Sequence, residues 1–171
     1  MKHIGKANRK DRVKITSRIW VKKDDRLFTL DVYIISGPIT GEFARKNKVV
    51  SRTIQIRGDQ TLEDLHHAIF NAFGREEEHM YEYQVGGKGP MDPKARRYVL
   101  PGAFDNPVRG SNPAGDVTLT TIGSLGMQVD DAFGYWFDFG DDWWFTIKLE
   151  EIAHDYYFGY PTLLDGAETA P

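Results

Sequence analysis

Three aspartates near the carboxyl-terminal end of the chain, Asp138, Asp141 and Asp142, are the sharpest group of residues that could do chemistry. Hard cations such as Mg²⁺ and Ca²⁺ prefer oxygen ligands, so neighbouring carboxylates could hold a divalent ion and support metal-assisted hydrolysis. A tight turn needs the same residue types, because aspartate side chains hydrogen-bond the local backbone and glycine accepts a positive φ. The turn is the favoured interpretation and no bound metal is expected, but the cluster remains the first candidate for a site.

Asp138 differs from the other two aspartates because it lies among the aromatic residues of an expected strand. A buried carboxylate is costly unless a hydrogen-bonding partner compensates it. We expect Arg52 or a backbone cap to be that partner.

Two histidines are further candidates. His66 lies near the edge of the apolar stripe of an expected helix, where an imidazole could act as a base or a metal ligand. The favoured interpretation is a residue at the core boundary that makes one hydrogen bond, since no metal-ligand spacing accompanies it. His79 precedes an expected strand and could approach His66 only if that strand packs under the end of the helix.

The aromatic residues Trp136, Trp144 and Tyr83 could form a platform that stacks nucleic-acid bases. Aromatic residues at alternating strand positions more often lie in the core, and the acidic surroundings would repel phosphate. The chain has no phosphate-binding loop, dinucleotide fingerprint or nucleophile–base pair. We therefore expect no cofactor.

Charge is distributed unevenly. Residues 1–26 hold ten Lys and Arg against three Asp, a balance of +7, and the remaining 145 residues hold 12 basic and 22 acidic residues, a balance of −10. A basic arm on an acidic body could bind phosphates, although a solvated terminus is the favoured interpretation. The candidate nucleic-acid contacts are Lys2, Lys6, Arg9, Lys10, Arg12 and Lys14.

The clearest element is a helix over 61–73. Apolar residues recur there at three- and four-residue intervals, Thr61 is a good N-cap with Asp64 three residues later, and Gly74 suits the position after the helix end. Strands are expected over 15–21, 27–35, 49–56 and 80–85, and a β-hairpin over 135–150.

This order of elements predicts a single α+β domain, in which one principal helix packs on a mainly antiparallel mixed sheet. We expect a basic amino-terminal arm over 1–26 with a first strand, the domain over 27–166, and a tail over 167–171. Residues 88–116, which are rich in proline, are expected to form a long irregular loop.

Composition narrows the setting. The chain contains no cysteine, begins without a secretory signal and has no apolar run long enough to cross a bilayer. We therefore expect a cytoplasmic protein without membrane contact.

Three segments together resemble the plasmid pRi-type open-reading-frame-three-like family of mobile-element passenger proteins: TLEDLHHAIFNAFG (61–74), HMYEYQVGG (79–87) and YWFDFGDDWWFTIKLE (135–150). Two positions depart from the family pattern: Ser51 precedes Arg52 where the family usually has tryptophan, and Arg75 follows Ala-Phe-Gly where tryptophan is common. The resemblance implies a fold and a mobile-element setting, and it implies no reaction.

Three functions remain open. The favoured one is a non-catalytic module that binds a protein partner. The alternative is a nucleic-acid-binding accessory protein that uses the basic arm, and a metal-assisted hydrolase at the aspartate cluster is the third.

Overall fold

Alternation of apolar and polar residues shapes the first described strand of the sheet. The computed structural model describes residues 23–76, 79–103 and 113–154, and the backbone of 162–166. Strand β1 (Leu27–Ser36) buries every second side chain, so one of its faces lies in the core. It pairs antiparallel with β2 (Ser51–Arg57) on one side and with β7 (Trp143–Ala153) on the other.

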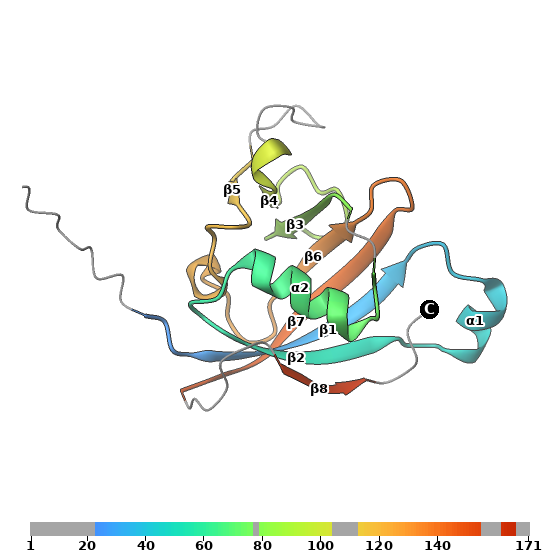
Figure 1. Cartoon of the computed structure of the whole chain (residues 1–171), viewed down its shortest axis with the longest axis horizontal. Coiled ribbons are helices and arrows are strands. Elements are labelled where there is room, and N and C mark those ends of the chain that lie inside the picture. Colours follow the sequence, from blue (N-terminus) through green and yellow to red (C-terminus); the bar gives the residue numbers. More distant parts are fainter. Residues whose placement is uncertain (1–22, 77–78, 104–112, 155–161, 167–171) are drawn as a thin grey trace, which may run out of the picture.

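The described strands form one eight-stranded sheet in the order β5-β4-β3-β6-β7-β1-β2-β8 (Figure 1). All neighbouring strands are antiparallel except β4 and β5, which are parallel. The remaining strands are β3 (Tyr81–Val85), β4 (Arg96–Val99), β5 (Gly115–Asp116), β6 (Ala132–Phe137) and β8 (Thr162–Gly166).

Helix α2 (Leu62–Ala72) covers one face of this sheet (Figure 1). It begins with a complete capping box: the Thr61 side chain accepts from the Asp64 backbone N–H, and the Asp64 carboxylate accepts from the Thr61 backbone N–H. Its apolar face buries Leu62, Leu65 and Ile69 against the sheet. Because helix stability in proteins comes mainly from such packing, α2 and the sheet depend on each other.

The shorter elements lie in the connections. Helix α1 (Gly41–Lys46) follows β1, with Thr40 as its N-cap. Two 3₁₀ turns cover Pro101–Ala103 and Ile122–Leu125. No helix of the described residues is both long and apolar enough to cross a membrane.

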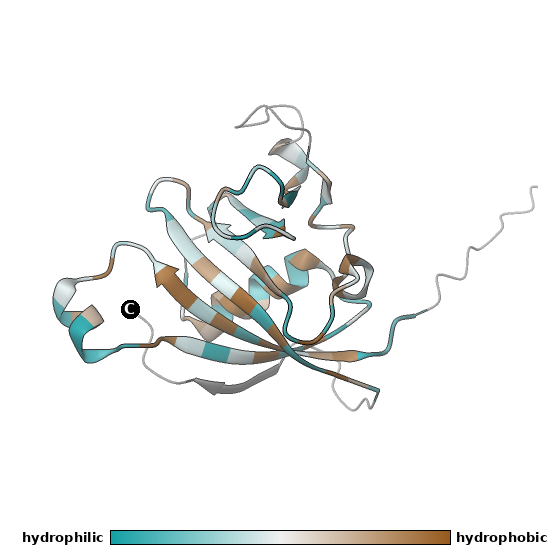
Figure 2. Ribbon diagram, turned by 180° about the vertical axis from the view of Figure 1, so that it is seen from behind, coloured by the Kyte–Doolittle hydropathy of each residue, from teal (hydrophilic) through white to brown (hydrophobic). Residues whose placement is uncertain are grey.

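The face of the sheet turned away from α2 is seen in Figure 2 and also contains buried groups. Glu82, which is almost fully buried, pairs with Arg97 across the β3–β4 ladder. Beside this pair, the Met91 backbone N–H donates to the Gln84 side chain, which holds the loop after β3 against the sheet. These contacts order a region that proline and glycine made difficult to predict.

The predicted α+β class, the principal helix and the carboxyl-terminal hairpin are confirmed. Residues 88–116, expected to be irregular, contain β4 and β5, because Arg96–Val99 pairs with β3 and then with Gly115–Asp116. The strand expected at 15–21 and the tail at 167–171 lie outside the described residues.

Candidate functional site

The aspartate cluster lies in the turn that joins β6 to β7. Asp138 and Asp142 both have positive φ, 52° and 60°, a conformation that aspartate tolerates better than most residues. One carboxylate oxygen of Asp138, Oδ1, accepts from the backbone N–H groups of Gly140 and Asp141 at 3.1 and 3.2 Å. Asp138 is therefore capped by backbone, one of the two partners expected for it.

Asp142 points to the face of the sheet turned away from α2. Its Oδ1 accepts from the indole Nε1 of Trp136 at 2.7 Å and from that of Trp144 at 3.0 Å. The two indoles stack with centroids 4.9 Å apart, and both are at least nine-tenths buried. These tryptophans and the fully buried Tyr83 therefore form no exposed platform for bases.

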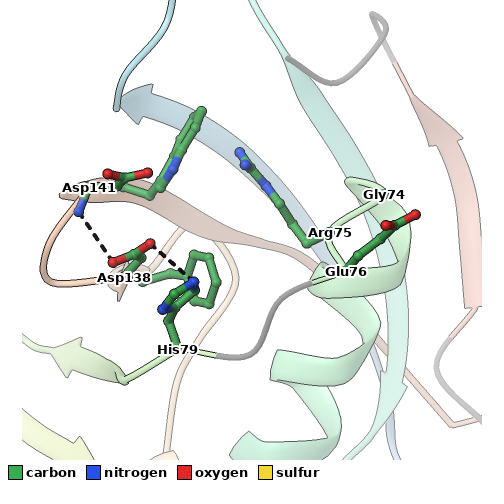
Figure 3. A pocket seen from close by; sticks show the side chains of 8 residues that line it. Gly74, Arg75, Glu76, His79, Asp138 and Asp141 are labelled. Carbon is green, nitrogen blue, oxygen red and sulfur yellow. Dashed lines mark hydrogen bonds and ion pairs between the residues drawn. The ribbon is translucent and has the colours of Figure 1, made fainter.

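Asp138 and Asp141 line a cavity of about 320 Å³ between the end of α2 and the turn (Figure 3). The second oxygen of Asp138, Oδ2, lies 3.5 Å from Nε2 of His79, which is partly exposed. We call this cavity the turn pocket; its lining consists of Gly74, Arg75, Glu76, His79, Phe137, Asp138, Asp141 and Trp143.

Arg75 is a site residue that the sequence did not identify. Its guanidinium lies over the Trp143 ring, 3.8 Å from the centroid, and the buried atoms Nε and Nη2 have no hydrogen-bond acceptor among the described residues. Burial lowers the pKa of the guanidinium, and the nearby charges of Asp141 and Asp138 oppose this shift. The signal that could have found it is arginine at a position where the resembled family commonly has tryptophan.

Gly37 packs closely against the ring of Trp143. A Cβ atom at this position would overlap the indole ring, so only glycine fits there. The connection after β1 thus fixes the ring on which Arg75 lies.

His66 lies deeper in the molecule. It is 1% exposed, its ring stacks on that of Tyr81 at 3.8 Å, and its Nδ1 is 2.7 Å from the Tyr135 hydroxyl. It borders a second cavity of about 450 Å³, which we call the Met80 pocket and which is lined by Glu63, His66, His67, His79, Met80, Tyr81 and Leu100. His79 therefore borders both cavities.

Arg52 is not the partner of Asp138. Its Nε donates to the carbonyl of Ala72 at 2.9 Å and its Nη1 to the carbonyl of Ser51, while the guanidinium lies over Phe73. The end of α2 leaves carbonyl groups without helical partners, and Arg52 satisfies one of them. It stabilises the helix end rather than the turn.

The structure thus divides the predicted site residues. Asp138, Asp141 and His79 meet in the turn pocket, His66 borders the neighbouring cavity, and Asp142 and Arg52 have separate partners. Within the described ranges, no group of three or more histidines and carboxylates is arranged to hold a metal ion. The candidate nucleic-acid contacts Lys2, Lys6, Arg9, Lys10, Arg12 and Lys14 lie outside those ranges.

The turn pocket can offer a ligand both hydrogen-bond donors and acceptors. The donors are on Arg75, the acceptors are on Asp138 and Asp141, and the imidazole of His79 can serve as either. The walls are aromatic, since Phe137 and Trp143 line the same cavity.

Comparisons with known proteins identify a matching family and a similar fold. The family model for the plasmid pRiA4b ORF-3-like protein matches residues 41–171. The crystal structure of MM3350, a protein of unknown function from Methanosarcina mazei Go1, is similar with a TM-score of 0.65 and 22% identity, covering 86% of this chain and 72% of that chain. This likeness concerns the fold alone. No curated protein matches the sequence.

Proposed function

The chain belongs to the plasmid pRiA4b ORF-3-like family, and from that premise we propose that it is a non-catalytic protein-interaction module. A peptide segment of the partner binds across the turn pocket and the Met80 pocket. Two neighbouring cavities of different character suit a peptide better than a single small molecule, because successive side chains of a peptide can enter different cavities.

The observation that carries this proposal is the position of His79, which borders both cavities. One cavity presents charged groups of the β6–β7 turn, and the other presents the exposed side chain of Met80 beside Tyr81 and Leu100. Methionine is an adaptable side chain that suits peptide-binding surfaces.

A random 12-residue peptide library displayed on phage tests the proposal. We expect the full chain to enrich a related set of peptides, and the double variant Met80→Ser/Asp141→Asn to lose them. The control is Leu119→Ser, because Leu119 is also exposed but borders neither cavity. Thermal midpoints within a few degrees of the wild type would show that all proteins are folded.

Failure to enrich any peptide sequence would overturn the proposal. Equal enrichment by the wild type and the double variant would also overturn it, because the peptides would then bind elsewhere.

A metal-assisted hydrolase is the second candidate function, and one observation favours it: an imidazole and three carboxylates border the same cavity. His79 beside Asp138 is the arrangement of a general base and the group that orients it. A thermal-shift screen with Mg²⁺, Mn²⁺, Ca²⁺ and Zn²⁺ tests it. A stabilisation that disappears in Asp141→Ala would support this function, and an unchanged midpoint with every ion would count against it.

A further inference from the structure

We infer that the peptide bound at this site carries a lysine or arginine next to an apolar residue, an inference that rests on the proposed function. Three features of the two cavities lead to it: the charge of the turn pocket, the hydrogen-bonding state of Arg75 and the apolar lining of the Met80 pocket.

The turn pocket has a surplus of negative charge. Asp138 and Asp141 lie at the turn and Glu76 stands at the rim, against the single guanidinium of Arg75, which leaves a formal charge of −2 when His79 is neutral. Among the described residues the Asp141 carboxylate has no ion-pair or hydrogen-bond partner, and its side chain is exposed.

Arg75 indicates a second requirement. Two of its donor atoms, Nε and Nη2, are shielded from solvent and have no acceptor among the described residues. Buried polar groups in native proteins rarely stay unsatisfied, so a shift of the side chain that brings these donors to a ligand acceptor is favourable. An anionic ligand would meet the repulsion of Asp138 and Asp141. A peptide carbonyl is an acceptor without charge, so a basic residue of a peptide brings both groups that the pocket lacks: a cation for the aspartates and a carbonyl for the guanidinium.

The Met80 pocket supplies the requirement for an apolar neighbour. Met80, Tyr81 and Leu100 line it, and its boundary with the turn pocket is His79. Adjacent side chains of an extended peptide point to opposite sides of its backbone. A peptide whose backbone runs along the boundary at His79 can therefore place one side chain in each cavity.

NMR titration of the ¹⁵N-labelled full chain with two dipeptides tests this specificity. The probe is N-acetyl-leucyl-arginine methylamide, and its control is N-acetyl-leucyl-citrulline methylamide, which has nearly the same shape without the charge. We expect saturable shifts of the Gly140 and Asp141 amides, with about fivefold weaker binding of the citrulline peptide. Binding of the arginine peptide should weaken at high salt.

Two variants with the same change of charge locate the effect. Asp141→Asn should reduce the preference for arginine over citrulline to about one, because it removes the carboxylate without a partner. Asp25→Asn, at an exposed position that borders neither cavity, should leave the preference unchanged.

Equal binding of both dipeptides would overturn the basic-residue inference and leave the proposed function intact. An equal loss in Asp141→Asn and Asp25→Asn would overturn it as well, since only the overall charge would then matter. If the dipeptides cause no shifts while library peptides without basic residues bind and depend on Asp141, the inference fails alone. If neither kind of peptide binds, both it and the proposed function fail.

Discussion

Aspartate carboxylates lie on both sides of the β6–β7 turn, and they have different roles on the two sides. On the side turned away from α2, Asp142 is exposed, but its carboxylate accepts from two buried indoles. On the other side, one carboxylate oxygen of Asp138 accepts hydrogen bonds from the turn backbone, and its second oxygen lies near His79. The side chain of Asp141 is exposed at the edge of the turn pocket.

The difference shows that the neighbours decide which carboxylate is structural. A carboxylate that satisfies buried donors cannot be released without leaving those donors unsatisfied. A carboxylate at the edge of a cavity has no such obligation and remains available to a ligand. Asp138, Asp141 and Asp142 are the same type of residue, so only the positions of the surrounding hydrogen-bond donors separate the two roles.

The largest expected effect comes from removing the carboxylate that accepts from the two indoles. Asp142→Ala should lower the free energy of unfolding by about 3 kcal/mol, because two buried indole N–H groups lose a charged acceptor. Urea denaturation measures this loss. The control Asp141→Ala should change stability by less than about 0.5 kcal/mol, and equal losses in the two variants would contradict the comparison.

Gly37→Ala should have the next largest effect, because it displaces Trp143, which lines the turn pocket. The new methyl group would overlap the Trp143 ring, and overpacking of this kind costs about 1–3 kcal/mol. Displacement of Trp143 should also shift the tryptophan emission spectrum. An unchanged free energy of unfolding would show that the Trp143 ring can move away at little cost, and that Gly37 does not fix this wall of the turn pocket.

Asp138→Ala should destabilise the turn by about 1 kcal/mol, because two backbone N–H groups lose their acceptor at a residue with positive φ. Asp138→Asn keeps an oxygen in the same position and should recover most of the stability. Chemical denaturation of both variants checks this. A loss of stability in the asparagine variant as large as in the alanine variant would mean that the contact with His79 matters more than the turn.

The smallest effect is expected for Arg75→Met. Methionine keeps an apolar contact with Trp143 while it removes a partly buried cation, two of whose donor atoms have no acceptor in the described part of the chain, so stability should change by less than about 1 kcal/mol. Thermal unfolding gives the stability. A strongly destabilised variant would show that Arg75, like Asp142, has a structural role.

The sequence predicted the elements better than it predicted the site. Helix α2 was predictable because its capping residues and its apolar period agree, and the hairpin because turn residues separate two aromatic arms. The pairing of Arg96–Val99 with β3 was not predictable, since prolines and glycines surround a segment that is ordered by its contact with Glu82.

Within the site, the residue types were correct but the partners were not all foreseeable. His79 and Asp138 meet because β3 pairs with β6, a long-range contact that no local pattern records. The guanidinium groups of Arg52 and Arg75 each lie over an aromatic ring, yet one caps a helix and the other lines a cavity. Such differences depend on which carbonyl or ring the fold brings within reach.

The position of β7 has a consequence for how the protein is made. This strand joins β6 to β1 and so connects the β3–β4–β5 part of the sheet to the β1–β2–β8 part, and its far end pairs Ala153 with Leu27. A growing chain on the ribosome therefore holds β1 and β2 long before the strand that completes their sheet has been synthesised. Pairing between distant segments is slow to form, so we expect the core to close only after synthesis has passed β7, and the earlier strands to need protection from association with other chains until then.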